Sequence, residues 1–275
     1  MSIVISSAIV LQAASPTGLP GGVTLDHPVI GWHNLVTAST IVADTEEAGF
    51  PASNLANPAT HLEWRAEDDS EQYLTITTNE VDPIDYVAVA RHNWGSAQIP
   101  VSIEGFIDGD WEEIVEEVIL PDDGPALFRA DLQSLAQIRI RLQEGTAIPR
   151  AAVVYAGRLL IMERKLYVGH VPMKHGRRTR VIDNMSESGN FLGAIELGAW
   201  RESVAPFSLI SPDWYRNYMD AFIADVGKRK PFFFGWRPGT YPLEIGYARL
   251  TEDPDPSPVG PSNLHAFDLK MKGVA

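Results

Sequence analysis

The sequence has no cysteine, no lysine before Lys165 and no long apolar run. The absence of cysteine excludes disulfide bonds, thiolate zinc sites and thiol catalysis, and leaves the cellular compartment open. The apolar stretch 3–11 is interrupted by Ser6 and Ser7 and is shorter than the roughly 20 residues of a membrane span. A signal peptide begins with basic residues, yet the first arginine or lysine is Arg65. We therefore expect no membrane insertion and no secretion by the standard route.

Basic residues are scarce in only one half of the chain. Of 275 residues, 22 are Lys or Arg and 36 are Asp or Glu, which gives a net charge of −14. Residues 1–150 hold 6 basic and 23 acidic side chains, a net charge of −17, whereas residues 151–275 hold 16 and 13, a net charge of +3. An acidic half repels a phosphate backbone, so we expect no nucleic-acid partner. The difference in charge predicts two parts with different neighbours.

Short strand-like runs dominate the first 160 residues. Turn sequences separate these runs, and Asp108-Gly109 between two alternating segments is a strong hairpin signal. Many short strands at this spacing predict a β-sandwich or barrel. The last run of this half ends at Met162, so we place the domain boundary just after it, with residues 1–163 in the first domain and 164–275 in the second.

One helix is predicted in the second part, over residues 212–226. Ser211 can cap it, Pro212 suits its first turn and Gly227 can end it. Apolar side chains recur within it at three- and four-residue steps and form one face. The predicted fold class is all-β with this single helix; the two resemblances given below imply an N-terminal jelly-roll sandwich, followed by a C-terminal β-sandwich or barrel that carries the helix.

Catalytic signatures are absent from the sequence. It contains no Gly-x-Ser-x-Gly elbow, no His-Glu-x-x-His helix, no Walker phosphate loop and no Gly-x-Gly-x-x-Gly turn. We therefore expect no enzyme, no catalytic residue and no cofactor. Asp108 and Asp110 offer hard oxygen ligands of the kind that calcium prefers. A plain hairpin turn is the favoured interpretation of these two residues, so no metal site is predicted.

Two tryptophans near expected loops provide a binding hypothesis. Trp94 lies in the segment Arg91-His-Asn-Trp-Gly95, and Trp111 follows the Asp108–Asp110 turn. An exposed tryptophan beside polar side chains can stack on a sugar ring. The glycan-binding candidates are therefore His92, Trp94 and Trp111. The alternative is that both tryptophans pack under the loops of a small sandwich.

A basic stretch, Lys174-His-Gly-Arg-Arg-Thr-Arg180, opens the second part. It can serve as a contact for an acidic neighbour, such as the first half of another copy, or it can be a solvated hairpin. Together with the apolar helix, this stretch supplies the candidate assembly contacts: Lys174, Arg177, Arg178, Arg180, Tyr215 and Phe222.

Several segments keep an order and spacing that a known domain family shares. They are Phe50-Pro-Ala-Ser-Asn-Leu55, Trp64-Arg65, Tyr73–Ile76, Ile84–Val87, Val101–Gly105, Asp108–Trp111 and Ile138–Leu142. This set resembles the discoidin (coagulation factor 5/8 C) domain, a galactose-binding-like jelly roll, over residues 30–162. The disulfide that often joins the ends of extracellular members is impossible here, because the chain has no cysteine.

Other segments are similar to proteins of bacteriophage tails. The Ala-Ser-Asn-Leu entry, the Trp-Arg strand and the Arg-His-Asn strand end are similar to jelly rolls of tail-tip proteins in long-tailed, siphovirus-type phages. Ser186-Glu-Ser-Gly189, the 212–226 helix and Lys230-Pro-Phe-Phe-Phe234 resemble the distal-tail type of domain.

The phage resemblance implies a structural virion protein that is assembled in the host cytoplasm. Six copies would form a homo-oligomeric ring at the end of the tail tube, in contact with tail-tube and tail-hub proteins. The jelly roll would brace the adhesion apparatus or touch host surface glycans. The alternative function is a carbohydrate-binding module that acts as an adhesin or as an enzyme accessory domain.

Overall fold

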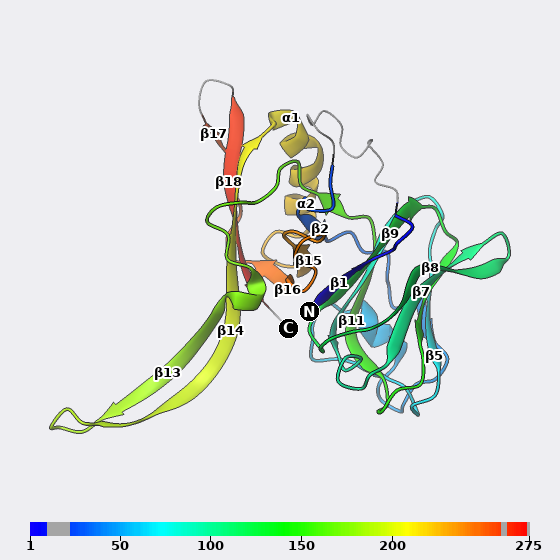
Figure 1. Cartoon of the computed structure of the whole chain (residues 1–275), viewed down its shortest axis with the longest axis horizontal. Helices are drawn as coiled ribbons and strands as arrows, with labels where there is room; N and C mark the ends of the chain where they lie inside the picture. The colour runs from blue at the N-terminus through cyan, green and yellow to red at the C-terminus, as the bar shows by residue number, and fades with distance from the viewer. Residues whose placement is uncertain (10–22, 260–262, 274–275) are drawn as a thin grey trace.

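The computed structural model describes residues 1–9, 23–259 and 263–273 (Figure 1). The described residues form three β-sheets, one helical segment and two short 3₁₀ turns, η1 (Ala52–Ala56) and η2 (Met173–His175). The predicted all-β fold class with a single helix is therefore confirmed. Among the described residues, no helix has the length and apolar character needed to cross a membrane.

Two five-stranded sheets form a β-sandwich, which lies on the right in Figure 1. One sheet has the strand order β1-β9-β6-β11-β4 and the other has the order β3-β5-β10-β7-β8. Strand β1 runs parallel to β9, whereas the other neighbours in both sheets are antiparallel. The strands are β1 (Ser2–Ile5), β3 (Ile41–Ala43), β4 (Trp64–Arg65), β5 (Gln72–Thr77), β6 (Ile84–His92), β7 (Pro100–Ile107), β8 (Asp110–Ile119), β9 (Ala126–Gln133), β10 (Gln137–Leu142) and β11 (Arg150–Gly157).

The strands of the first sheet are buried on both of their faces. Successive side chains of a strand point to opposite sides, and in β6 Val87 and Val89 face the core of the sandwich. Tyr86 and Ala88 face the other way, into a second apolar layer that also contains Phe233 of the C-terminal part. This double burial explains the continuous apolar run of β11, because a strand without a solvated face needs no polar alternation.

A third sheet packs on that outer face. Its order is β12-β2-β15-β16-β18-β14-β13, with β17 beside β18. The strands β2 and β12 belong to it, although the predicted boundary after residue 163 assigns both to the first domain. The chain thus starts in the sandwich with β1, crosses to this sheet, builds the rest of the sandwich and returns. The strands are β2 (Val29–Gly31), β12 (Leu160–Ile161), β13 (Arg177–Met185), β14 (Phe191–Ile210), β15 (Phe232–Gly235), β16 (Ile245–Leu250), β17 (Ser257–Val259) and β18 (Leu264–Gly273).

The helical segment covers the remaining face of the third sheet. It consists of α1 (Pro212–Trp214), a π turn η3 (Tyr215–Met219) and α2 (Asp220–Asp225). The predicted cap is confirmed, because the Ser211 hydroxyl accepts the Trp214 N–H at 3.3 Å. Gly227 follows the helix with φ +46°, a conformation that favours glycine.

One part of the third sheet projects away from the rest of the chain. Strand β13 and the first half of β14 extend as a two-stranded ribbon toward the lower left of Figure 1. We call residues 177–201 the arm. Its first strand contains most of the basic stretch that the sequence singled out.

Candidate functional sites

The arm exposes an unusual amount of apolar surface for a two-stranded ribbon. All nine residues of β13 are exposed. Seven large apolar side chains of the arm are between 47 % and 67 % exposed: Val181, Ile182, Met185, Phe191, Leu192, Ile195 and Leu197. An isolated two-stranded ribbon is marginally stable in water. Within the described residues, the apolar side chains of the arm thus remain open to solvent.

Cross-strand pairs determine which apolar side chains lie together on the arm. Ile182 lies opposite Ile195, and Met185 lies opposite Phe191 near the tip. The register shifts at two places, between Arg180 and Val181 and again near the tip. Such shifts bend and twist a ribbon. The pattern concentrates the apolar side chains on the distal part of the arm.

The basic residues of the arm lie at its base and are partly neutralised within the chain. Arg177 lies 3.5 Å from Glu196, and Arg178 lies 3.4 Å from Glu202. Arg180 has no ion pair among the residues that the structure describes. Lys174 precedes the arm in η2, and its carbonyl oxygen accepts a hydrogen bond from Arg201. The predicted contact stretch is thus on the surface, with one fully free guanidinium.

The two apolar assembly candidates on the helix are not on the surface. Tyr215 and Phe222 are buried within the chain. Tyr215 packs edge-on against Phe267 at 5.2 Å, and Phe222 packs against Phe232 at 5.1 Å. Their prediction as assembly contacts is corrected for a physical reason: the apolar face of the helix covers its own sheet, so no second copy is needed to bury it.

The glycan candidates do not form an exposed aromatic platform. Trp94 has 0 % of its surface exposed and belongs to the sandwich core. The structure therefore has the alternative arrangement, in which this ring packs under the loops. Trp111 is partly exposed on the other sheet, where its ring contacts Phe106 and the guanidinium of Arg139.

His92 holds a loop in place from inside the sandwich. Its Nδ1 accepts the Trp94 N–H at 3.2 Å, and its Nε2 donates to the carbonyl oxygen of Gly124 at 2.8 Å. Burial lowers the pKa of His92 to about 4. The imidazole is therefore neutral at pH 7 and acts as a positioning group for the loop before β9.

The Asp108–Asp110 segment is a hairpin turn, as the favoured interpretation predicts. Asp108 and Gly109 connect β7 to β8 with φ values of +51° and +98°. Two positive φ values are typical of the type I′ turn, which matches the twist of the flanking strands. Within the described ranges there is no group of three or more His, Asp or Glu side chains that could hold a metal ion.

A pocket of about 470 Å³ opens at the loop end of the sandwich, beside the base of the arm. We call it the loop pocket. It is bounded by the end of β6, the loop before β9, the start of β11 and one residue of β14. The charged side chains that line it are Glu63, Arg91, Asp122, Asp123, Arg150 and Arg201.

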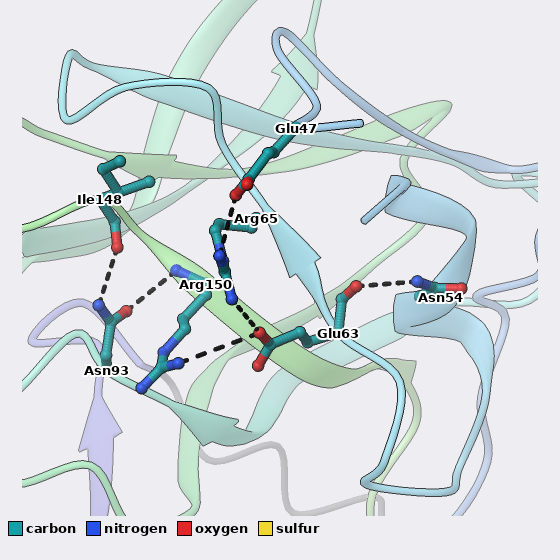
Figure 2. Close-up of polar contacts among 7 residues, drawn as sticks. All are labelled: Glu47, Asn54, Glu63, Arg65, Asn93, Ile148 and Arg150. Carbon is teal, nitrogen blue, oxygen red and sulfur yellow. Dashed lines mark hydrogen bonds and ion pairs between the residues drawn. The ribbon is translucent and has the colours of Figure 1, made fainter. Parts of the chain in front are cut away.

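Short polar contacts fix the walls of the loop pocket. The Asn93 side chain donates to the Ile148 carbonyl at 2.8 Å and accepts the Arg150 N–H at 3.0 Å (Figure 2). In the same view Arg65 lies between two carboxylates, 3.1 Å from Glu47 and 2.8 Å from Glu63. The strands β6, β4 and β11 are therefore joined by side chains as well as by the sheet.

The carboxylates of the loop pocket already have partners. Glu63 is paired with Arg65, the Asp122 carboxylate accepts the Gly124 N–H at 2.9 Å, and the Asp123 carboxylate accepts the Ser96 N–H at 2.7 Å. The nearest approach of the Arg150 guanidinium to a carboxylate is 4.0 Å, to Glu63. Arg91 is exposed and has no ion pair within the described part of the chain.

Only indirect signs of this pocket are present in the sequence. Its residues sit at strand ends and in the turn Pro121-Asp-Asp-Gly124, where polar side chains gather. Their convergence depends on pairing β4 with β11 and β11 with β6, across more than 50 residues of chain. No local pattern carries that information.

Comparisons with known proteins return matches of fold only. No family model matches the sequence, and no curated protein does. Among solved structures, the chain is similar to chitosan-binding module 1 of a chitosanase/glucanase from Paenibacillus sp. IK-5, with 15 % identity and a TM-score of 0.41 over 46 % of this chain and 100 % of that one. It is also similar to a Clostridium perfringens module in complex with GalNAc-β-1,3-galactose, with 12 % identity and a TM-score of 0.40 over 46 % and 100 %. A family 32 module of C. perfringens NanJ in complex with galactose is similar with 14 % identity and a TM-score of 0.39, over 46 % of this chain and 98 % of that one. These structures are carbohydrate-binding modules, and similarity at this level assigns no function to the chain.

Proposed function

We propose that this protein is a structural subunit that assembles with copies of itself through the arm. The observation that carries the proposal is the set of seven half-exposed apolar side chains on a ribbon that no other described part of the chain covers. Burying the exposed part of these side chains is worth on the order of 5–10 kcal/mol. Exposed patches of this kind mark interaction surfaces in folded proteins.

The shape of the arm favours an assembly in which each copy reaches the next. An arm and the surface that receives it are different parts of the chain, so the contact is head-to-tail, and such contacts close into rings when the rotation allows. From the sequence resemblance to distal-tail proteins, we propose that this assembly forms in the virion of a long-tailed phage. There, six copies would form a ring that contacts tail-tube and tail-hub proteins. In this role the chain acts by binding, without catalysis.

Light scattering and negative-stain imaging of the purified chain test the assembly. Phe191→Ser together with Leu192→Ser removes the two most exposed apolar side chains of the arm. Val42→Ser is the matched control, because Val42 is 57 % exposed on the sandwich, away from the arm. We expect rings or defined oligomers for the wild type and the control, and smaller species for the arm variant. A wild type that stays monomeric at high concentration, alone and with tail-tube protein, would contradict the proposal.

A second candidate function is carbohydrate binding by the sandwich, as an adhesin or an enzyme accessory module. The observation that favours it is the loop pocket, whose walls are fixed by hydrogen bonds and whose charged groups face one opening. In this candidate function the sugar binds in the loop pocket and not on an exposed aromatic surface formed by Trp94 and Trp111. A glycan array probed with the full chain tests the candidate: binding that Arg150→Ala abolishes supports it, and no binding to any glycan removes it.

A further inference from the structure

We propose that the loop pocket binds a sugar that carries a carboxylate, and that Arg91 is the residue that pairs with this carboxylate. The inference rests on the carbohydrate-binding candidate and is independent of assembly through the arm. It adds a ligand class, an acidic sugar, and a specificity-determining residue.

The first support is the convergence of cationic groups from three separate elements. Arg91 lies near the end of β6, Arg150 begins β11 and Arg201 lies at the base of the arm on β14, and all three line the same volume of about 470 Å³. Pockets that hold small molecules are typically about 300–1,000 Å³. The loop pocket is therefore large enough for a sugar and lies within reach of three guanidinium groups.

The second support is the charge that remains after the internal contacts are counted. The three acidic side chains of the lining are held by Arg65, by the Gly124 N–H and by the Ser96 N–H. The amino group of Met1 also contacts Asp122, but burial lowers the pKa of this amino group to about 5, so it is neutral at pH 7. Arg91 has no such partner among the described residues. The positive charge that remains without a partner is thus that of Arg91, whereas Asp122 and Asp123 keep their negative charge, because a backbone N–H does not neutralise a carboxylate.

The third support is the backbone of Arg91 itself. Its φ is +55°, a left-handed conformation that a non-glycine residue rarely adopts. The strand pairing on either side is regular, with His92 opposite Ala151 and Ala90 opposite Val153. Strain of this kind costs stability and is concentrated at binding sites, where the surrounding contacts maintain it. Here it accompanies a side chain that is exposed and unpaired.

The chemistry of the lining matches the two parts of an acidic sugar. A guanidinium is planar and donates two parallel hydrogen bonds to a carboxylate, which gives both affinity and orientation. The carboxylate oxygens of Asp122 and Asp123 are exposed acceptors that can take further hydrogen bonds from sugar hydroxyls. A neutral sugar would leave Arg91 unpaired, whereas a simple anion would leave the acceptors unused.

The experiment compares matched sugars that differ only in the carboxylate. The full chain is titrated, by calorimetry and by NMR, with galacturonate against galactose, glucuronate against glucose and mannuronate against mannose. Acetate and inorganic phosphate serve as anions without a sugar ring. We expect at least one uronate to bind about tenfold or more tightly than its neutral partner and than either simple anion.

Variants then locate the site. Arg91→Gln should lose the preference for the uronate, whereas Arg216→Gln, an exposed arginine on the helical segment, should keep it. Arg91→Gly is the second variant, because glycine accepts the positive φ and the protein stays folded while the guanidinium is absent. Equal binding of neutral and acidic sugars would overturn this inference and leave carbohydrate binding standing. Binding of no sugar would overturn both the acidic-sugar inference and carbohydrate binding. If acetate or phosphate bound as tightly as the uronates, the pocket would be a general anion site, and the assignment of a sugar would be overturned.

Discussion

The imidazole of His92 donates a hydrogen bond to the carbonyl oxygen of Gly124 at 2.8 Å, and this contact joins the end of β6 to the loop before β9. The ring is buried, and its burial lowers the pKa of His92 to about 4. The folded chain therefore protonates His92 near pH 4, whereas an unfolded chain protonates histidine near pH 6.5. Because the unfolded state binds more protons between these values, acidification favours unfolding.

We predict that His92 causes a loss of stability as the pH falls from about 6.5 to about 4, and that its contribution is fully present above pH 6.5. The full loss is about 3 kcal/mol, from the difference between the two pKa values. Burial raises the pKa of Asp85 to about 6, which acts in the opposite direction between about pH 4 and pH 6. The measurement is therefore the difference in free energy of unfolding between the wild type and His92→Gln, obtained by urea unfolding from pH 4 to pH 8. Parallel pH profiles for the two proteins would contradict the prediction.

A second prediction concerns the positive φ of Arg91. Replacement by glycine removes the clash of the β-carbon in this conformation, so Arg91→Gly should unfold at the same or higher denaturant concentration, with a gain of up to about 1 kcal/mol. Arg249→Gly is the matched control, because Arg249 is an exposed strand residue of β16 outside the positive-φ set. The control should lose about 0.5–1 kcal/mol. An equal loss in both variants would show that Arg91 is not strained.

The burial of Trp94 gives a third prediction. Trp94→Ala should lower the free energy of unfolding by about 3–5 kcal/mol, because it opens a large cavity in the core of the sandwich. Trp111→Ala should cost clearly less, since Trp111 is partly exposed and rests on Phe106 and Arg139. Chemical denaturation of the two variants checks the order. A smaller loss for Trp94→Ala than for Trp111→Ala would contradict the core position.

Features that depend on residues close together in the chain, such as turns and helix caps, can be predicted from the sequence. The Asp108-Gly109 hairpin and the Ser211 cap depend on neighbouring residues, whose conformational preferences are strong, and both were predicted correctly. The assignment of β2 and β12 to the third sheet depends on the pairing of β2 with β12 and with β15, across roughly 130 to 200 residues of chain. Hydrophobic periodicity shows that a strand is buried, but it does not show which strand lies beside it.

The candidate sites were less predictable for the same reason. The sequence leaves open whether Trp94 is exposed or packed, and it places Tyr215 on an apolar helix face without showing what covers that face. Both side chains are covered by elements that lie far away in the chain. The arm shows the opposite case. Its apolar residues, such as Ile195 and Leu197, are typical of a buried strand, and only the structure shows that nothing in the described chain covers them.

The last prediction concerns the salt dependence of assembly. Each copy carries a net charge of −14, so copies repel one another at low ionic strength. The distal part of the arm concentrates exposed apolar side chains, and Arg177 and Arg178 already pair with acidic residues of their own chain, which leaves little attraction between copies for salt to screen. Association should therefore strengthen when sodium chloride is raised from about 20 mM to about 500 mM, because the Debye length falls well below the size of a subunit. Sedimentation velocity across this range measures the shift. Association that weakens with salt would show instead that ion pairs between copies, with Arg180 as the free candidate, dominate over the apolar contact.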